Sequence, residues 1–355
     1  MRRVSFQFLL PCAVVACLWA AAVPAHAVTI DWVTVGDPGN AYDTINTGTN
    51  PNYGAVADSF RIMKFEFTNQ QYTDFLNSVD PNGTNPNSVY SESGQGGTAR
   101  GGITNTGTTN GSRYAVKPNM GDKPVNFVNW FDAARVSNWL MNGATGTSSM
   151  ETGAYTLNGA TSGNAPAVNP GATFYIPTEN QWYKAAYYKG GSTNAGYWTY
   201  ATQSDAVPTA VTAGLTGSGS SGSTGNYANY GRAAGWNGQN GNVTTVGTNG
   251  GASAYGAFDM SGNVNEWNDL DGLASSGSSR GLRAGSWFDP AFTLSSPIRS
   301  SVPPSSEFIY YGFRLASPVS SPSAVPEIDP NSLGSVLALA LGSLGLLEHR
   351  RLKAA

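Results

Sequence analysis

The feature that most constrains this chain is the absence of cysteine and histidine from residues 28–325. Both cysteines and both histidines lie towards the two ends, at Cys12, Cys17, His26 and His349. Without disulfides, the central region must be stabilised by its hydrophobic core, and its length is sufficient for one large domain. Without thiols and imidazoles, it also lacks the usual metal ligands, nucleophile and proton carrier at neutral pH. Function must therefore rely on carboxylates, amides, hydroxyls, arginines and aromatic rings.

The N-terminal segment has the pattern of a secretory signal peptide. Two arginines precede an apolar stretch over 6–23, and Ala25-His26-Ala27 is a small-x-small cleavage site. We expect signal peptidase to cleave after Ala27, which assigns 1–27 to the signal. One alternative is a membrane helix, although a proline interrupts the apolar stretch. Another is lipoprotein processing at Cys17, although apolar residues follow that cysteine where a polar tether is usual.

The C-terminal segment has three parts in order. A Ser/Pro/Val/Ala linker at 317–325 leads into Val325-Pro326-Glu327-Ile328-Asp329-Pro330, then an apolar stretch over 332–347 and a basic cluster at 349–353. The apolar stretch of 16 residues is short of the ~20 that span a bilayer, and a plain tail anchor is one interpretation. The arrangement of 326–355 resembles the PEP-CTERM sorting signal of bacterial exopolysaccharide-associated proteins. That resemblance implies processing by an exosortase, transient anchoring in the membrane, and a final place on the cell surface or in the extracellular matrix.

The charge of the central region argues against a nucleic-acid partner. The whole chain has 19 Lys+Arg and 22 Asp+Glu. Leaving out the five basic and three acidic residues of the two terminal signals gives 14 basic and 19 acidic residues in the centre. This balance is weakly acidic and no basic cluster is evident, whereas nucleic-acid binding requires concentrated positive charge.

The patterning predicts an α+β fold with long loops. Helices are expected after the capping boxes that begin at Thr68 and Thr178, and after a cap at Asn129, because apolar residues then recur at helical spacing. Strands are expected at 61–67, 174–176 and 282–287, and Gly/Ser/Thr/Asn-rich surface loops at about 80–112, 142–171 and 205–226. The order is not a regular βαβα alternation, which favours α+β.

Five motifs in order carry a family resemblance. They are the stretch 64–76, which includes Thr68-Asn69-Gln70-Gln71-Tyr72; Lys123-Pro124-Val125-Asn126-Phe127-Val128-Asn129-Trp130; Ile176-Pro177-Thr178-Glu179-Asn180-Gln181-Trp182; Gly262-Asn263-Val264-Asn265-Glu266-Trp267; and Leu282-Arg283-Ala284-Gly285-Ser286-Trp287, closed by Gly312-Phe313-Arg314. The series resembles the formylglycine-generating, or sulfatase-modifying factor, family. The resemblance implies a single C-type-lectin-like α+β domain over 28–316 with little regular secondary structure.

The same resemblance argues against the oxidase activity of that family. Its catalytic members hold copper(I) with two cysteines, three and eight residues after the serine that matches Ser286. The corresponding residues here are Asp289 and Leu294. Copper(I) prefers soft thiolate ligands, so we expect no copper and no cysteine oxidation. Ser286, Asp289 and Leu294 are then expected to be non-catalytic.

Other catalytic arrangements are weaker. Ser286 has no histidine to act as its base. Glu266 and Asp259 could form an acid/base pair, but they lie in a motif that is structural in the resembling family. Arg283, Arg299 and Arg314 are expected to bind loop carbonyls or carboxylates rather than a substrate.

Calcium is the metal that the remaining residues could bind. Hard cations take several oxygen ligands at once, and loops rich in Asn, Asp and Gly supply them. The resemblance implies one structural calcium held by Asn263, the Val264 carbonyl and Glu266. It implies a second at Asn229 and Tyr230, although the aspartate expected downstream is missing from 235–240. The alternatives are that Asn263 forms an ordinary turn and that Glu266 accepts hydrogen bonds from backbone amides or an arginine.

We therefore expect an exported, non-catalytic binding protein, with exopolysaccharide or other glycans as ligand. Aromatic rings among amides and hydroxyls suit sugars, because apolar faces pack on CH groups while amides bind hydroxyls. An enzyme of unrelated chemistry on the same fold and a purely structural matrix protein are the alternatives. The residues expected to contact the ligand are Trp198, Tyr200, Tyr227, Tyr230 and Trp236.

Overall fold

The computed structural model of the chain describes residues 28–45, 52–108, 112–270 and 279–319. The predicted signal peptide (1–27) and sorting signal (326–355) lie outside the described residues, as does most of the predicted linker. No helix within the described ranges is long and apolar enough to cross a membrane.

All three predicted helices are present, and each begins at its predicted cap. The Thr68 and Thr178 side chains accept hydrogen bonds from the backbone N–H of Gln71 and Gln181, and the glutamines return the contact. Asn129 and Asp132 form the same reciprocal pair of hydrogen bonds. The cap at Asn129 was predicted, and its completion by Asp132 was not. These boxes satisfy amides that would otherwise lack partners at the helix N-termini. The helices are α1 (Asn69–Val79), α2 (Trp130–Met141) and α3 (Glu179–Tyr187).

Two sheets and two small strand pairs complete the α+β architecture. In the first sheet, β2 lies between β1 and β11, and both pairings are antiparallel. In the second sheet the order is β10-β7-β8-β9, and only the β10–β7 pair is parallel. The strand bounds are β1 (Trp32–Val35), β2 (Phe60–Met63), β3 (Ile103–Asn105), β4 (Tyr114–Val116), β5 (Thr209–Ala210), β6 (Tyr227–Ala228), β7 (Asn265–Asn268), β8 (Arg280–Arg283), β9 (Ser300–Val302), β10 (Tyr311–Gly312) and β11 (Ala316–Pro318).

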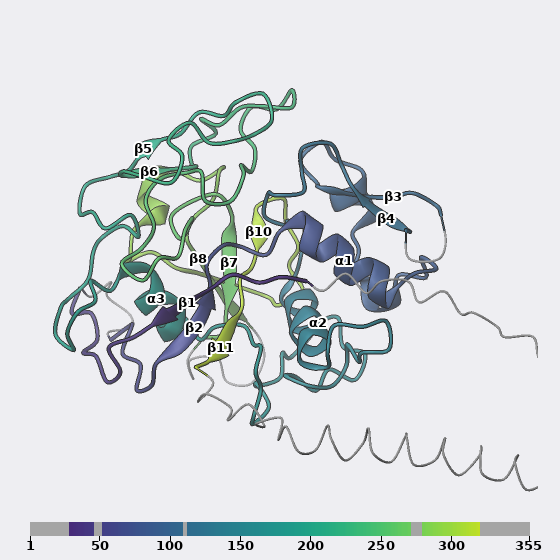
Figure 1. Cartoon of the computed structure of the whole chain (residues 1–355), viewed down its shortest axis with the longest axis horizontal. Helices are drawn as coiled ribbons and strands as arrows, with labels where there is room; N and C mark the ends of the chain where they lie inside the picture. Colours follow the sequence, from purple (N-terminus) through teal and green to yellow (C-terminus); the bar gives the residue numbers. More distant parts are fainter. Residues whose placement is uncertain (1–27, 46–51, 109–111, 271–278, 320–355) are drawn as a thin grey trace, which may run out of the picture.

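The core is divided between two large clusters of buried side chains. Helices α1 and α2 contribute to one cluster, and α3 joins the β1-β2-β11 sheet in the other. Figure 1 shows α1 and α2 on one side of the molecule, α3 with β1 and β2 on the other, and β7 and β10 between them. Long loops around β5 and β6 cover one end. The second sheet therefore lies where the two halves of the core meet.

The predicted strands were placed only approximately. Strand β2 ends at Met63, and β8 ends at Arg283 because Ala284 and Gly285 adopt φ of +88° and +66°, which an extended strand cannot contain. The strand predicted at 174–176 is wrong, because Tyr175 forms only a single bridge to Ala316 before Pro177 and α3.

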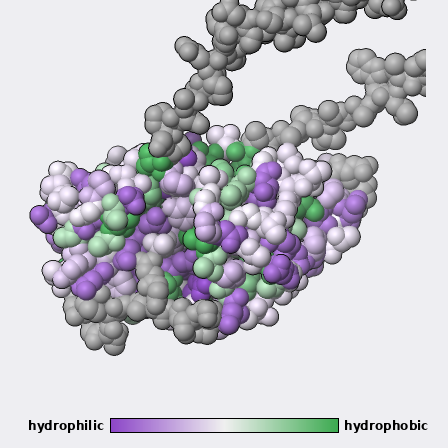
Figure 2. Space-filling view, turned by 90° about the horizontal axis from the view of Figure 1, so that it is seen from below, coloured by the Kyte–Doolittle hydropathy of each residue, from purple (hydrophilic) through white to green (hydrophobic). Residues whose placement is uncertain are grey.

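The predicted loops also contain short elements that composition alone did not reveal, namely the strands β3 and β5 and the helical turns Pro86–Ser88 and Glu92–Gly96. Strand β11 extends two residues into the segment predicted as a linker. The face drawn in Figure 2 is mostly polar or weakly polar, with apolar residues in small separate groups.

Candidate functional site

The turn that follows β8 places Ser286 and Asp289 together. Ser286 is buried, and its Oγ donates a hydrogen bond of 2.6 Å to Asp289 Oδ2. The same oxygen accepts from Asn265 Nδ2, on β7, at 2.9 Å. Within the described residues, no hydrogen bond to Asp289 Oδ1 is found. Ser286 is therefore a donor that orients the Asp289 carboxylate.

Leu294 lies in a different environment from Asp289. It is fully buried in a small apolar cluster with Tyr200 and Ala228. The two positions that correspond to the copper cysteines thus hold one polar carboxylate and one core leucine. Neither side chain supplies a thiolate, and the residues present do not fit copper(I).

A pocket of about 210 Å³ opens beside Asp289. Its walls come from β7, β8, β9, β10 and the segments that connect them, and combine hydroxyls, an amide, a carboxylate, two guanidinium groups and two phenol rings. Thr293, rather than Leu294, reaches this pocket. The lining residues are Asn265, Leu282, Arg283, Gly285, Asp289, Thr293, Ile298, Arg299, Ser300, Tyr310 and Tyr311.

The two arginines of the pocket share one buried carboxylate. Arg283 contacts Glu179 Oε1 at 2.6 Å and also donates to the carbonyls of Ser296 and Ile298. Arg299 lies 3.0 Å from the same Glu179 oxygen, and its side chain is 25% exposed. Both arginines bind carboxylates or carbonyls, as predicted. Two positive charges against one negative charge leave this wall of the pocket with an excess of positive charge.

Tyr310 and Tyr311 also line the pocket, close enough to Asp289 to interact with its carboxylate. Burial raises the pKa of Tyr311 to about 12, with smaller contributions from Tyr310 and Asp289. Burial, followed by the Asp289 carboxylate, also raises the pKa of Tyr310. Both phenols therefore keep their protons at neutral pH and can donate hydrogen bonds.

An aromatic row extends from the pocket across the surface. Tyr310 stacks on Phe288 at 5.6 Å and on Phe308 at 5.7 Å, with interplanar angles of 25° and 5°. Phe288 and Phe308 are 40% and 48% exposed. We define the aromatic row as Phe288, Tyr310 and Phe308. Half-exposed stacked rings beside a polar pocket are typical of a ligand-binding surface.

Glu266, expected as a calcium ligand, forms a buried ion pair. Arg314 donates to Glu266 Oε2 through Nε at 2.6 Å and to Oε1 through Nη2 at 2.7 Å. Trp182 Nε1 also donates to Oε2, at 2.8 Å. All three side chains are buried, and although burial opposes the charge of Arg314, the carboxylate raises its pKa. The contact matches the alternative in which Glu266 accepts hydrogen bonds from an arginine.

The side chains of the predicted acid/base pair, Glu266 and Asp259, are both buried and both already hydrogen-bonded. Asp259 is buried and accepts hydrogen bonds from Gly247 N and Asn249 Nδ2. A third carboxyl group, Glu66, is fully buried nearby and accepts from Asn263 Nδ2 at 3.1 Å. Burial raises the pKa of both Asp259 and Glu66, and the neighbouring carboxylates raise that of Glu66 further.

The remaining predicted calcium ligands lie close together. Asn229 Nδ2 points at three oxygens, namely Asn263 Oδ1 at 3.1 Å, Thr244 Oγ1 at 3.0 Å and the Asn242 carbonyl at 2.9 Å. Its own Oδ1 is buried and has no hydrogen-bond donor among the described residues. Those three oxygens already accept from the Asn229 amide N–H, so the atom left to bind a hard cation is the buried Asn229 Oδ1, whereas both Glu266 oxygens are bound by Arg314. Tyr230 instead donates its hydroxyl to the Pro208 carbonyl, and Val264 is buried.

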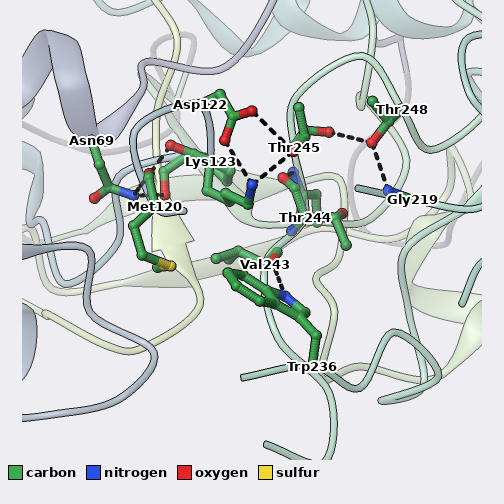
Figure 3. A network of polar contacts seen from close by, with 12 residues as sticks. Asn69, Met120, Asp122, Lys123, Gly219, Trp236, Val243, Thr244, Thr245 and Thr248 are labelled. Carbon is green, nitrogen blue, oxygen red and sulfur yellow. Dashed lines mark hydrogen bonds and ion pairs between the residues drawn. The ribbon is translucent and has the colours of Figure 1, made fainter. Parts of the chain in front are cut away.

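Trp236, expected to contact a ligand, is only 6% exposed. Its Nε1 donates to the Val243 carbonyl, and Lys123 Nζ lies 5.2 Å from its ring centroid. Lys123 is held in turn by Asp122 and Thr245, as Figure 3 shows. A Cβ on Gly217 would lie 2.4 Å from the ring, so the glycine packs directly on the indole. Trp236 therefore fastens the surrounding loop to the body of the domain.

The other expected contact residues are not gathered at one place. Tyr200 is buried beside Leu294, and Tyr230 packs partly against the same cluster. Trp198 is half-buried beneath Lys189, whose Nζ lies 4.1 Å from the ring centroid. Tyr227, at 39% exposed, is the most open of the five.

The aromatic row and Tyr311 were not among the ligand contacts predicted from the sequence. The four-residue run Phe308-Ile309-Tyr310-Tyr311, just before the Gly312-Phe313-Arg314 motif, was the available signal. Three aromatic residues in four positions, in a chain that is 11% aromatic, mark this segment as a candidate ligand-binding surface.

Solved structures with similar folds include three at low sequence identity. Treponema denticola variable protein 1 is 21% identical, with 83% of this chain and 97% of that chain covered and a TM-score of 0.48. CarF is 22% identical, with 82% and 99% covered and a TM-score of 0.49. PvdO from Pseudomonas aeruginosa is 18% identical, with 82% and 92% covered and a TM-score of 0.42. No curated protein matches this chain significantly.

The comparison with protein families gives a match over most of the chain. The profile described as "Sulfatase-modifying factor enzyme 1-like domain" matches residues 22–319. This range contains all five motifs and every described helix and strand. The α+β, C-type-lectin-like architecture expected from the resemblance is confirmed. The chain therefore belongs to the sulfatase-modifying factor enzyme 1-like family.

Proposed function

We propose that this protein is a non-catalytic binding protein of an extracellular matrix, and that the pocket beside Asp289 holds a glycan. The observation that carries the proposal is the pocket itself, which combines phenol rings, hydroxyls and an amide beside Asp289, one of the two positions that match the thiolates of the family's oxidases. Such a lining binds sugars, because rings pack on CH groups and polar side chains bind hydroxyl groups. Asp289 Oδ1 and the Tyr310 hydroxyl are well suited to sugar hydroxyls.

The lining also favours binding over glycoside hydrolysis. Glycosidases need two carboxyl groups about 5–10 Å apart across the scissile bond. Among the described residues, Asp289 is the one carboxylate that lines the pocket. Glu179 is buried and does not line the pocket, and its carboxylate is bound by Arg283 and Arg299.

Export and matrix attachment belong to the same proposal. They rest on the sequence patterns of 1–27 and 326–355, which imply signal peptidase and an exosortase as processing partners. In a host that has an exosortase, intact-mass measurement of surface protein should show loss of the tail. Surface protein that retains Arg350 and Arg351 would favour a simple anchor.

We also propose a structural calcium between the loops of Asn229 and Asn263, supported by the buried Asn229 Oδ1, which has no hydrogen-bond donor among the described residues. When bound, the ion would fix the loop that carries Asn229 against the loop that carries Asn263.

A glycan array with the purified protein tests the binding function. We expect a defined group of glycans to bind, and Tyr310→Ala to weaken binding about tenfold, which corresponds to ~1.4 kcal/mol for the lost phenol hydrogen bond. Leu215→Ser is the control, since Leu215 is 98% exposed and does not line the pocket.

Three other outcomes would contradict the proposal. Turnover of a bound glycan would make the protein an enzyme of other chemistry. Self-association with no small ligand would make it purely structural. Loss of binding in Tyr227→Ala but not in Tyr310→Ala would move the site to the surface around β6.

A further inference from the structure

Two arginines lie together at one end of the aromatic row. The guanidinium carbon of Arg232 is 4.0 Å from the Phe288 ring centroid, and that of Arg100 is 4.9 Å from the ring centroid of the adjacent Trp287. Both arginines touch Gly241. Arg100 Nε donates to the Gly241 carbonyl at 2.9 Å, and a Cβ on Gly241 would lie 2.6 Å from the Arg232 Cα. The two side chains therefore flank a single glycine.

Neither Arg100 nor Arg232 forms an ion pair with a carboxylate of the described residues. Burial and then the charge of Arg232 lower the pKa of Arg100 from its usual value, which is consistent with two like charges near each other. Like charges side by side are unfavourable unless an anion joins them. In a chain of net charge −3, such a pair is an unusual local concentration of positive charge.

The backbone holds Arg232 against the row. Gly231 and Arg232 have φ of +62° and +61°, a conformation that is ordinary for glycine but unfavourable for arginine. Gly231 N donates to the Asp289 carbonyl at 2.8 Å, and Arg232 N donates to the Trp287 carbonyl at 2.7 Å. These bonds tie the turn to the segment that carries Phe288 and Asp289. Unfavourable backbone conformations that the surrounding structure enforces are common at ligand-binding sites.

The row itself adds to the positive potential. Tyr310 is stacked between Phe288 and Phe308, and Phe288 lies between Tyr310 and Arg232. Because both faces of the Tyr310 and Phe288 rings are covered in this way, these two rings present their edges to solvent. The edge of an aromatic ring carries partial positive charge. The outer part of the surface therefore suits an anion, while the inner pocket, with its Asp289 carboxylate, suits hydroxyl groups.

We propose that the glycan is an acidic polysaccharide, whose sugar hydroxyls enter the pocket and whose anionic groups bind Arg232 and Arg100 along the aromatic row. This inference rests on the glycan-binding function proposed above and adds the chemical class of the ligand. The anionic group can be a uronic-acid carboxylate or a sulfate ester, because both accept hydrogen bonds from guanidinium groups.

The test compares the affinity of the full-length protein for polygalacturonate, for its methyl ester and for dextran sulfate. We expect polygalacturonate to bind at least tenfold more tightly than the neutral ester. Arg232→Gln should weaken polygalacturonate binding about fivefold and leave binding of the ester unchanged, since an exposed charge contact contributes modestly. Arg61→Gln is the charge-matched control, because Arg61 lies on β2 in the other sheet, where its side chain bonds Ser317. Dextran sulfate bound with the same dependence on Arg232 would support the inference and identify sulfate as a second source of the anion.

The outcomes separate the two proposals. Equal affinity for polygalacturonate and its ester, or an Arg232→Gln variant that binds like the wild type, would overturn the acidic ligand while leaving glycan binding intact. Poly-L-glutamate bound as tightly as polygalacturonate would also overturn it, in favour of an acidic peptide. Failure of every glycan to bind would refute the proposed function itself.

Discussion

Replacing Glu266 with alanine is expected to destabilise the domain by about 3–5 kcal/mol, whether or not calcium is present. Both members of the Glu266–Arg314 pair are fully buried. The substitution removes the acceptor of two hydrogen bonds from Arg314 and one from Trp182, and it leaves a guanidinium group in the interior without its carboxylate. Glu66 and Asp259 lie close enough to interact with Arg314, and ionisation of Glu66 would offset part of the loss. The lower half of the range is therefore the better expectation.

Urea unfolding followed by tryptophan fluorescence measures this change, and the slope with urea concentration should stay constant. Glu92→Ala is the control, since Glu92 is exposed and should change stability by less than about 1 kcal/mol. Each variant is measured in calcium and in chelator. If Glu266→Ala cost several kcal/mol in calcium but almost nothing in chelator, Glu266 would be a metal ligand and the ion-pair reasoning would be refuted.

Three further predictions concern proton, calcium and copper binding. Burial raises the pKa of Asp132 to about 8. The folded state therefore keeps a proton that the unfolded state releases near pH 4. Because of this difference, the free energy of unfolding should fall as the pH rises from about 4 to about 8. Asp132→Asn keeps an oxygen that can accept from Asn129 N, and its unfolding free energy should fall less steeply over this range; an unchanged slope would contradict the assignment. Chelator should lower the melting temperature of the wild type but not of Asn229→Ala, and no effect on the wild type would exclude a structural calcium. The purified protein should retain no copper(I) and form no aldehyde on cysteine-containing sulfatase peptides, because Asp289 and Leu294 cannot replace thiolates; stoichiometric copper with aldehyde formation would overturn the binding function.

The sequence predicted the elements whose signals are local. The capping boxes at Thr68 and Thr178 lie next to the helices they begin, and apolar spacing then continues each helix. The family resemblance could also be recognised from the sequence, because its motifs are short and occur in the same order as in the family. Strands were harder to place, since the end of β8 depends on the positive φ of Ala284 and Gly285 rather than on composition.

The candidate site depended on contacts between distant segments. Trp236 lies in a glycine-rich loop and resembles a surface platform, yet Lys123 and Gly217 cover its ring. Glu266 lies in an asparagine-rich motif typical of calcium loops, but its partner Arg314 is 48 residues away. The pocket is formed by β7, β8, β9, β10 and their connecting segments, and no single motif contains both Asp289 and Tyr310. Side-chain partners of this kind are set by the tertiary fold.

The central claim is that the pocket beside Asp289 is the ligand-binding site. Its most direct test is a crystal structure of the protein with an oligosaccharide drawn from a glycan that binds. The account predicts sugar density in contact with Asp289, Tyr310 and Arg299. Density at another surface, such as that around Tyr227 and Trp198, with this pocket empty, would contradict it.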